Sequence, residues 1–318
     1  MTGFPHQIPA AVTLAPMDGL TDAPARALLT SYGGISYCTT EFVRVSGTPL
    51  PERVLLKECP ELLSGGRTPS GTPVSVQILG GDPKLMAETA RRLAALGALA
   101  IDINFGCPAR CVNRHDGGSA LLRYPDRLYA IVAAVRDAVP DAAPVSAKIR
   151  LGFASPDDVF TNAPQIERAG ATWLTLHART REQQYKPFAD WERIRRVREC
   201  VKLPLVANGD VFVPADIGRC RAATGTQHVM AGRGVIADPF FFAATRPYSG
   251  NRFLIELARA CLSRPGGPSP VQITARLKHW AKAILPEAGF GIFKRFSELD
   301  PALHYLEATD PDPLRACA

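Results

Sequence analysis

The sequence predicts an α/β protein in which a closed (β/α)8 barrel, the TIM barrel, is followed by a small all-helical domain. Short apolar segments alternate with helical patterns, as in parallel sheets whose strands are buried on both faces. Eight such repeats within about 240 residues fit the barrel. The alternative is an open doubly wound sheet, but the GxGxxG turn that often follows its first strand is absent here.

The eight predicted strands occupy the apolar segments of this repeat. They cover residues 11–16, 35–41, 73–80, 98–104, 144–150, 172–178, 203–208 and 226–232. Helical patterns fill most of the gaps, for example at 82–97, 124–139 and 190–201. Pro83 and Pro125 indicate helix starts after Asp82 and Tyr124, because proline suits the first turn of a helix.

Two irregular segments interrupt the repeat. Residues 42–73 form a long connection, in which we expect one short helix and a loop rich in Gly, Pro and Ser. Near residues 245–251 the alternation stops, and only helical patterns follow, including those at 271–285 and 301–308. We therefore predict a barrel domain over residues 1–245 and a helical domain over 246–318.

The composition is that of a globular protein, since 46% of the 318 residues are hydrophobic and 21% are charged. No apolar stretch approaches the roughly 18 residues of a membrane helix. The N-terminus lacks the pattern of a secretory signal, so we expect a cytoplasmic protein with no membrane partner. The formal net charge of +7 suits a polyanionic partner but is a weak signal alone.

The eight cysteines are scattered along the chain, unlike those of a small secreted disulfide framework. Cys107 and Cys111 lie close together, but no second pair completes a zinc site, so we expect no metal.

Polar or small residues stand at the end of nearly every predicted strand. Catalytic groups of such barrels lie at the C-terminal ends of the strands, so these residues are the candidates for a site. They are Pro16, Met17, Asp18, Glu41, Gln77, Asn104, Cys107, Lys148, Arg150, His177, Asn208, Gly209, Asp210, Gly232 and Arg233.

The last two strands end in ANGD and AGRG, which indicate a phosphate site. Glycine lets backbone NH groups approach a ligand closely, and Arg233 adds a fixed positive charge at the place where these barrels commonly bind phosphate. Tight strand-to-helix turns are the alternative for each segment taken singly. Two such segments in succession favour phosphate.

Lys148 and His177 end adjacent predicted strands. The lysine suits either a Schiff-base nucleophile or a cation beside an anionic ligand. Its alternative role is an internal ion pair with Asp102 or Glu41. A lone histidine is more often a satisfied core residue than a catalyst, and only its position at a strand end makes His177 a candidate.

Cys107 has three interpretations: buried filler, nucleophile or proton donor. An unperturbed thiol, with a pKa of about 8.5, is mostly protonated near pH 7 and therefore suits proton donation. A nucleophile needs a partner that stabilises the thiolate, and only His115 is nearby in the sequence. The Gly-Cys-Pro setting, followed by a loop with two glycines, favours an exposed thiol on a mobile loop.

These segments together resemble the tRNA-dihydrouridine synthase family from about residue 12 to 245, and more weakly in the helical tail. The motifs that carry the resemblance are LAPMDGLTDAPARAL, TEFVRV, RTPSGTPVSVQILG, NFGCPARCVNRHDGGSALL, KIRLGF, HARTREQQY, ANGD and AGRG. TEFVRV, CPEL and RTPSGT are similar to the bacterial C-type branch, which acts on uridine 16 of the tRNA D-loop.

The resemblance implies an FMN-bearing barrel, NADPH as the reductant and a helical domain that holds tRNA. The residues implied to bind FMN are Pro16, Met17, Asp18, Gln77, Lys148, His177, Asn208, Gly209, Asp210, Gly232 and Arg233. Asp210 replaces the glutamate that is common in the C-type branch. The residues implied to touch RNA are Arg44, Asn104, Tyr185, Arg276, Lys278 and Arg295, the last on a loose match.

The resemblance also implies a reaction, in which a uracil ring receives a hydride from reduced FMN and a proton from Cys107. For Asn104, the alternative to holding the pyrimidine is a turn residue at the strand end. For RLKHW (276–280), it is a solvated helix face with Trp280 in the core. We expect a monomer.

Two other enzyme classes remain open from the residues alone. One is a flavin barrel that acts on a free pyrimidine, similar to dihydroorotate dehydrogenase. The other is a flavin-free aldolase that uses Lys148 as a Schiff base.

Overall fold

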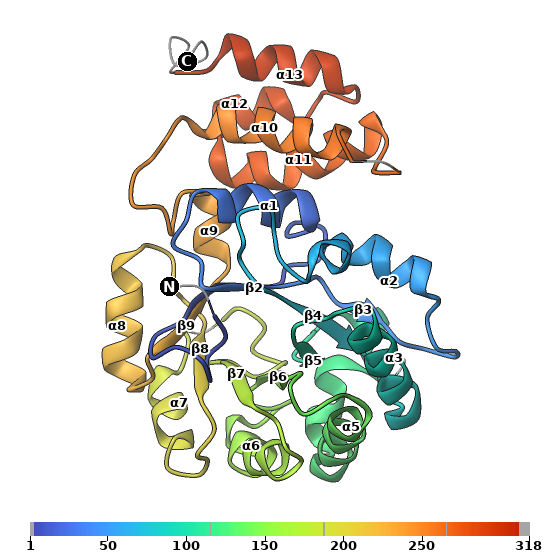
Figure 1. Cartoon of the computed structure of the whole chain (residues 1–318). Helices are drawn as coiled ribbons and strands as arrows, with labels where there is room; N and C mark the ends of the chain where they lie inside the picture. The colour runs from blue at the N-terminus through green and yellow to red at the C-terminus, as the bar shows by residue number, and fades with distance from the viewer. Residues whose placement is uncertain (1–2, 115, 187, 265, 312–318) are drawn as a thin grey trace.

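Eight parallel strands form a closed ring at the centre of the protein (Figure 1). The computed structural model describes residues 3–114, 116–186, 188–264 and 266–311. The ring consists of β1 (Val12–Leu14), β2 (Tyr37–Thr39), β4 (Val74–Leu79), β5 (Ile101–Phe105), β6 (Val145–Arg150), β7 (Trp173–His177), β8 (Leu205–Asn208) and β9 (His228–Ala231). Each overlaps one predicted strand.

Two pairings close the ring. β1 pairs with β9, with Leu14 opposite Ala231, and β2 pairs with β4, with Cys38 opposite Val74. Both pairings are parallel, as are those between the other neighbours in the ring. The predicted barrel is therefore confirmed, and the open doubly wound sheet is excluded.

Helices cover the outside of the barrel (Figure 1). They are α1 (Ala23–Ser31), α3 (Pro83–Ala95), α5 (Pro125–Ala138), α6 (Val159–Arg168), α7 (Trp191–Val197), α8 (Ala215–Thr224) and α9 (Arg233–Ala237). The predicted start at Asp82 is confirmed, because its carboxylate accepts hydrogen bonds from Lys84 N and Leu85 N.

The long connection after β2 contains more structure than the sequence predicted. The expected short helix is α2 (Glu52–Glu58), and a 3₁₀ turn, η1 (Pro60–Ser64), follows it. The connection also holds β3 (Val43–Arg44), a two-residue strand that pairs with β4 and is too short to leave a pattern in the sequence. Later connections contain α4 (Arg110–Asn113), η2 (Gly118–Arg123) and η3 (Pro156–Asp158).

Aromatic side chains fill the barrel at the N-terminal ends of its strands. Tyr37 and Trp173, the first residues of β2 and β7, are each 1% exposed. The Phe4 ring packs against Trp173 with a centroid distance of 5.4 Å. In the described part of the chain these packed rings close this end, so a ligand would enter the barrel from the opposite end, where the strands finish.

Four helices form a tail that packs against α1 and α9 (Figure 1). They are α10 (Gly250–Leu262), α11 (Pro270–Ile284), α12 (Glu287–Phe293) and α13 (Leu299–Ala308). Ser249 and Ser269 cap the first two helices, the second through a capping box with Gln272. The expected helical character after residue 245 is confirmed for the described residues. None of the described helices is long and apolar enough to span a bilayer.

Gly34 is required where α1 turns into β2 against the segment that leads to the tail. Its φ is +77°, and a Cβ there would lie 2.0 Å from the carbonyl oxygen of Phe242. The neighbouring Gly33 also has a positive φ of +80°, but a Cβ there would meet nothing within 4 Å.

We expect Gly34→Ala to lower the free energy of unfolding by about 3–5 kcal/mol, because backbone strain and a steric clash add. Gly33→Ala should lower the free energy of unfolding by about 1–2 kcal/mol, because only the backbone strain applies there. Urea unfolding followed by circular dichroism measures both. Equal losses for the two variants would contradict the close approach to Phe242.

Candidate active site

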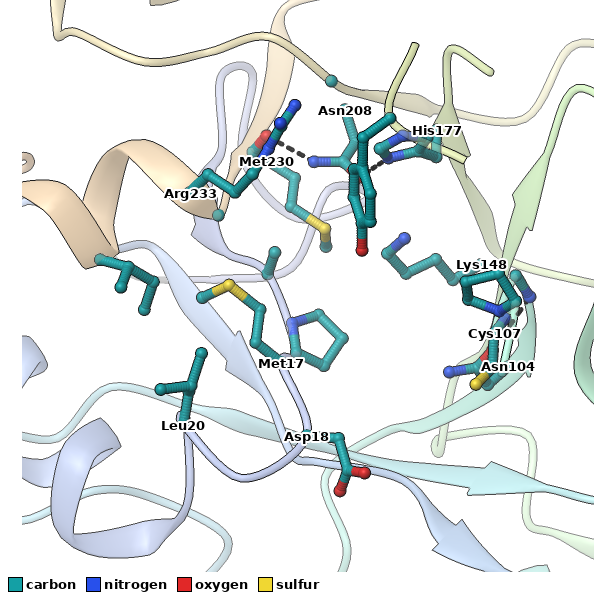
Figure 2. A pocket seen from close by; sticks show the side chains of 18 of the residues that line it. Met17, Asp18, Leu20, Asn104, Cys107, Lys148, His177, Asn208, Met230 and Arg233 are labelled. Carbon is teal, nitrogen blue, oxygen red and sulfur yellow. Dashed lines mark hydrogen bonds between the residues drawn. The ribbon is translucent and has the colours of Figure 1, made fainter. Parts of the chain in front are cut away.

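A cavity of about 620 Å³ opens at the end of the barrel where the strands finish (Figure 2). Most of the residues predicted for the site line it. They are Pro16, Met17, Asp18, Glu41, Gln77, Asn104, Cys107, Lys148, Arg150, His177, Tyr185, Asn208, Gly209, Asp210, Gly232 and Arg233. Lys148 enters from the same side as Cys107 and Asn104, and Met17 lies across the cavity (Figure 2).

The backbone of Cys107 is fixed on both sides. Asn104 Oδ1 accepts hydrogen bonds of 2.9 Å from the N–H groups of Gly106 and Cys107. The Cys107 carbonyl accepts from Ser119 N at 3.1 Å and from Asn113 Nδ2 at 3.0 Å. Asn104 thus uses its Oδ1 as a strand-end turn residue, and this turn holds Cys107 at the cavity. Its amide nitrogen Nδ2 is not part of the turn and donates to Gln77 instead.

The Cys107 thiol is suited to hold a proton. Its side chain is partly buried, and burial raises its pKa above the usual value, with smaller opposing effects from the backbone and from Arg150. The thiol is therefore protonated at neutral pH, which favours the proton donor over the nucleophile. His115, the candidate thiolate partner, lies outside the described residues.

A buried hydrogen-bond chain orients Asn104. Asn104 Nδ2 donates to Gln77 Oε1 at 2.8 Å, and Gln77 Nε2 donates to Asp102 Oδ2 at 2.7 Å. Ser146 Oγ donates to the other oxygen of Asp102 at 2.6 Å. Asp102 thus supports the site through Gln77. The only sign of this role in the sequence is an acidic residue inside an apolar strand.

Lys148 brings a partly buried cation to the cavity, with no acidic group of the described residues in ion-pair contact. No salt bridge within 4 Å joins it to any acidic residue in the described part of the chain, so the ion pair with Asp102 or Glu41, the alternative role, does not form. Burial, and then repulsion by Arg150, lowers the Lys148 pKa to about 8. The lysine is still mostly protonated at pH 7 and can face an anionic ligand.

His177 is held as a neutral imidazole. Its Nδ1 lies 2.8 Å from Asn208 Oδ1, and Asn208 Nδ2 donates to the carbonyl of Met230 at 2.9 Å. This assignment of the amide makes His177 Nδ1 the donor. Burial and the nearby Arg150 and Lys148 hold the His177 pKa well below its usual value. Its Nε2 is buried and has no partner among the described residues, so it is an acceptor available to a ligand.

Asp210 joins the two arginines at the rim. Its carboxylate accepts hydrogen bonds from Arg179 Nη2 at 2.6 and 2.7 Å, from Ala189 N at 2.7 Å and from Arg233 Nη2 at 3.0 Å. Arg179 is 2% exposed, whereas Arg233 is 45% exposed. Because Arg179 already balances Asp210, the positive charge of Arg233 remains available to an anion.

Four of the residues predicted to touch RNA do not line the cavity: Arg44, Arg276, Lys278 and Arg295. Arg44, on β3, donates through Nη2 to Cys111 O at 3.4 Å, next to the loop of Cys107. Arg295 is exposed, and Lys278 is partly exposed on α11. Trp280 is fully buried, as in the alternative interpretation of its helix.

The structure does not place Arg276 on an open surface, as a phosphate contact would require. Its side chain is 12% exposed, forms an ion pair with Asp22 and donates from Nη2 to Leu20 O at 3.0 Å. Burial lowers its pKa to about 10. Arg276 therefore joins the tail to the barrel loop that begins at Met17.

Glu41 holds the same loop from the barrel side. Its Oε1 accepts a hydrogen bond of 2.9 Å from Leu20 N. Leu20 is thus bound through its N–H by Glu41 and through its carbonyl by Arg276. Burial, partly offset by Arg26, raises the Glu41 pKa to about 7. The sequence marked Glu41 only as a polar strand end, since nothing local reveals its partner.

Comparison with known proteins identifies the family. The family model described as dihydrouridine synthase (Dus) matches residues 13–256. A relative from Shewanella oneidensis, named tRNA-dihydrouridine(16) synthase, is 46% identical over 93% of this chain and 99% of its own. One of the same name from Pseudomonas putida is 43% identical over 87% of this chain and 90% of its own.

Solved structures support the barrel fold. Histamine dehydrogenase from Rhizobium sp. 4-9 superimposes with a TM-score of 0.56 at 15% identity, over 87% of this chain and 51% of that one. A 2-naphthoyl-CoA reductase gives 0.56 at 12% identity, over 72% of this chain and 49% of that one. At such identities the likeness concerns the fold alone.

We expect Arg276→Met to lower the free energy of unfolding by roughly 1–3 kcal/mol, because it leaves the carboxylate of Asp22 partly buried without its partner. Lys278→Met, on the same helix, should change it by no more than about 0.5 kcal/mol. Urea unfolding compares the two. A similar small effect for both would show that the Arg276 ion pair contributes nothing.

The raised pKa of Glu41 predicts that the stability of the protein depends on pH. Its folded pKa of about 7 lies above the unfolded value of 4.5, so its favourable contribution is complete below pH 4.5 and is lost as the pH rises through 7. Between these limits the free energy of unfolding of the wild type should fall by about 3 kcal/mol relative to that of Glu41→Gln, whose side chain cannot ionise. Urea unfolding of the ligand-free proteins at pH 5 and 8 tests this; parallel pH profiles would refute it.

Proposed function

The chain belongs to the dihydrouridine synthase family, and from this premise we propose that it is an FMN-dependent enzyme that reduces a uridine of tRNA to 5,6-dihydrouridine, with NADPH as the reductant. The name shared by its relatives from Shewanella oneidensis and Pseudomonas putida supports position 16 as the target. The proposed enzyme acts as a cytoplasmic monomer.

The residues around the cavity fit FMN. A volume of about 620 Å³ lies within the range of about 300–1,000 Å³ that is usual for ligand pockets. The unpartnered Nε2 of His177 offers an acceptor, and Lys148 offers a cation. At the opposite wall, a Cβ on Gly232 would lie 3.2 Å from Ala15 Cβ and 3.3 Å from the Met17 sulfur, so the glycine keeps this wall open.

Each group has a role in this proposal. Pro16, Met17 and Asp18 line the flavin, with Gln77, Lys148 and His177 beside its ring. The phosphate group is bound by Arg233 together with the segment of Asn208, Gly209 and Asp210 and the backbone of Gly232. The charge balance supports this assignment, because Asp210 is already neutralised by the buried Arg179.

The observation that carries the proposal is the position of Cys107 at the cavity, where its backbone is held by hydrogen bonds and burial raises the pKa of its thiol. Bound FMN supplies the hydride for the pyrimidine ring. Cys107 donates the proton of its Sγ to C5 of the pyrimidine. Lys148 offsets the negative charge of the reduced flavin. Asn104 uses one amide N–H for Gln77, which leaves the other for a pyrimidine carbonyl. The target base must leave the RNA stack to reach this site.

In this proposal residues 1–245 hold FMN and residues 246–318 contribute the tRNA surface. Ala283 of α11 lines the cavity, so the tail borders the place where a flipped base enters. The basic or aromatic residues proposed for RNA contact are Arg44, Tyr185, Lys278 and Arg295. The partly buried ion pair of Arg276 supports a positioning role for this residue instead.

Cys107→Ala should leave FMN bound and NADPH oxidation intact, while dihydrouridine formation in tRNA falls at least about 10²-fold, because the proton donor is lost. The exposed Cys111 provides the matched control, and Cys111→Ala should keep full activity. The visible spectrum reports FMN, and mass spectrometry of tRNA digests reports the product.

Two outcomes would contradict the proposal. Undiminished turnover of tRNA by Cys107→Ala would remove the thiol from the reaction. Reduction of free uridine as fast as tRNA by the wild type would favour the small-molecule flavin barrel.

A further inference from the structure

Arg150, the last residue of β6, is a buried cation that borders the cavity. It is 4% exposed. In the described part of the chain, no carboxylate lies within salt-bridge distance of it. Placing an arginine here without an acidic partner is costly, and burial is the main reason that its pKa is lowered. An apolar side chain at this position would cost less free energy to bury. Packing alone therefore does not explain the arginine.

The contacts of this guanidinium connect two loops. Its Nε donates to Gly106 O at 2.9 Å, immediately before Cys107. Its Nη1 donates to Thr180 O at 3.2 Å and to Gln184 O at 2.9 Å, immediately before Tyr185. Gly106 belongs to the loop after β5, and Gln184 belongs to the loop after β7. The planar fork of arginine suits such a bridge, whereas the single ammonium of lysine does not.

The second loop is strained at the point where Arg150 holds it. Gln184 has a φ of +50°, a left-handed conformation that costs a non-glycine residue about 1–2 kcal/mol. Its bound carbonyl helps to maintain this conformation, which sets the direction of the following Tyr185. The Arg150 guanidinium also lies 5.7 Å from the centroid of the Tyr185 ring. One side chain therefore binds both loops, which carry an aromatic ring and a thiol that line the cavity.

We propose that Arg150 is a positioning residue that sets the separation of the Cys107 thiol and the Tyr185 ring, so that a uracil held between them lies within reach of the proton. This inference rests on the proposed function for its substrate. The arrangement of the two loops around Arg150 does not depend on that function, and it can be measured separately.

The direct test uses Arg150→Met, which removes the fork, and Arg150→Lys, which keeps the charge. Arg193→Met is the control, because Arg193 is also mostly buried, at 19% exposure, and pairs with Asp157 and Asp190 away from the cavity. Trypsin cleaves after Arg110, so Cys107 and Cys111 fall on separate peptides and their alkylation by iodoacetamide can be followed independently.

In Arg150→Met, iodoacetamide should alkylate Cys107 at least about threefold faster than in the wild type, because the loop loses one of its anchors and the thiol gains exposure. Arg150→Lys should show the same change to a smaller extent. Cys111, already exposed, should react at an unchanged rate in every variant. Arg193→Met should lose stability without any change at Cys107.

Turnover should separate positioning from binding. With FMN retained, kcat for tRNA should fall about 10²-fold in Arg150→Met and about tenfold in Arg150→Lys, while KM stays within about twofold. If Arg150→Met does not fold, Arg150→Lys decides. Unchanged kcat and unchanged Cys107 alkylation in the folded variants would overturn the inference. A wild type that modifies no tRNA would refute the proposed function instead, and the alkylation rates would still test the loop anchor.

Discussion

Closure of the parallel sheet is the constraint on which the rest of the structure depends. Once β1 pairs with β9 and β2 with β4, every strand must finish at the same end of the ring. Residues as distant in sequence as Met17 and Arg233 then border one cavity. Packed aromatic rings close the opposite end. The position of the site thus follows from the topology, before any individual side chain is considered.

Basic side chains gather around His177 on one side of the cavity. Lys148, Arg150 and Arg179 gather near His177, and their repulsion adds to burial in keeping the imidazole neutral. Of the nearby carboxylates, Asp102 is engaged by Gln77 and Ser146. The part of the cavity around His177 therefore holds several basic groups, which favour an anion there, as a phosphate or a reduced flavin would provide.

The helical tail is part of the site rather than a separate attachment. Its α11 contributes Ala283 to the cavity, and Arg276 of the same helix binds the carbonyl of Leu20. Glu41 binds the N–H of the same residue from the barrel. The loop that carries Met17 and Asp18 is thus held between the two parts of the chain, so a shift of the tail would be transmitted to one wall of the cavity.

The sequence by itself determined the order of strands and helices and the cavity at the strand ends, which Cys107 lines as expected. These conclusions rest on local patterns, because hydrophobic periodicity and the residues that end a strand are visible within a few positions. It missed β3, whose two residues are too few for any period.

Only the tertiary structure decided how particular side chains are used. Asn104 holds the loop of Cys107, Arg276 is buried against Asp22, and Arg150 joins two loops. In the sequence, each arginine looks like any other basic residue. A hydrogen bond depends on where its partner lies in space, and Asp22 stands more than two hundred positions from Arg276. Such a pairing exists only after the barrel has closed and the tail has packed onto it.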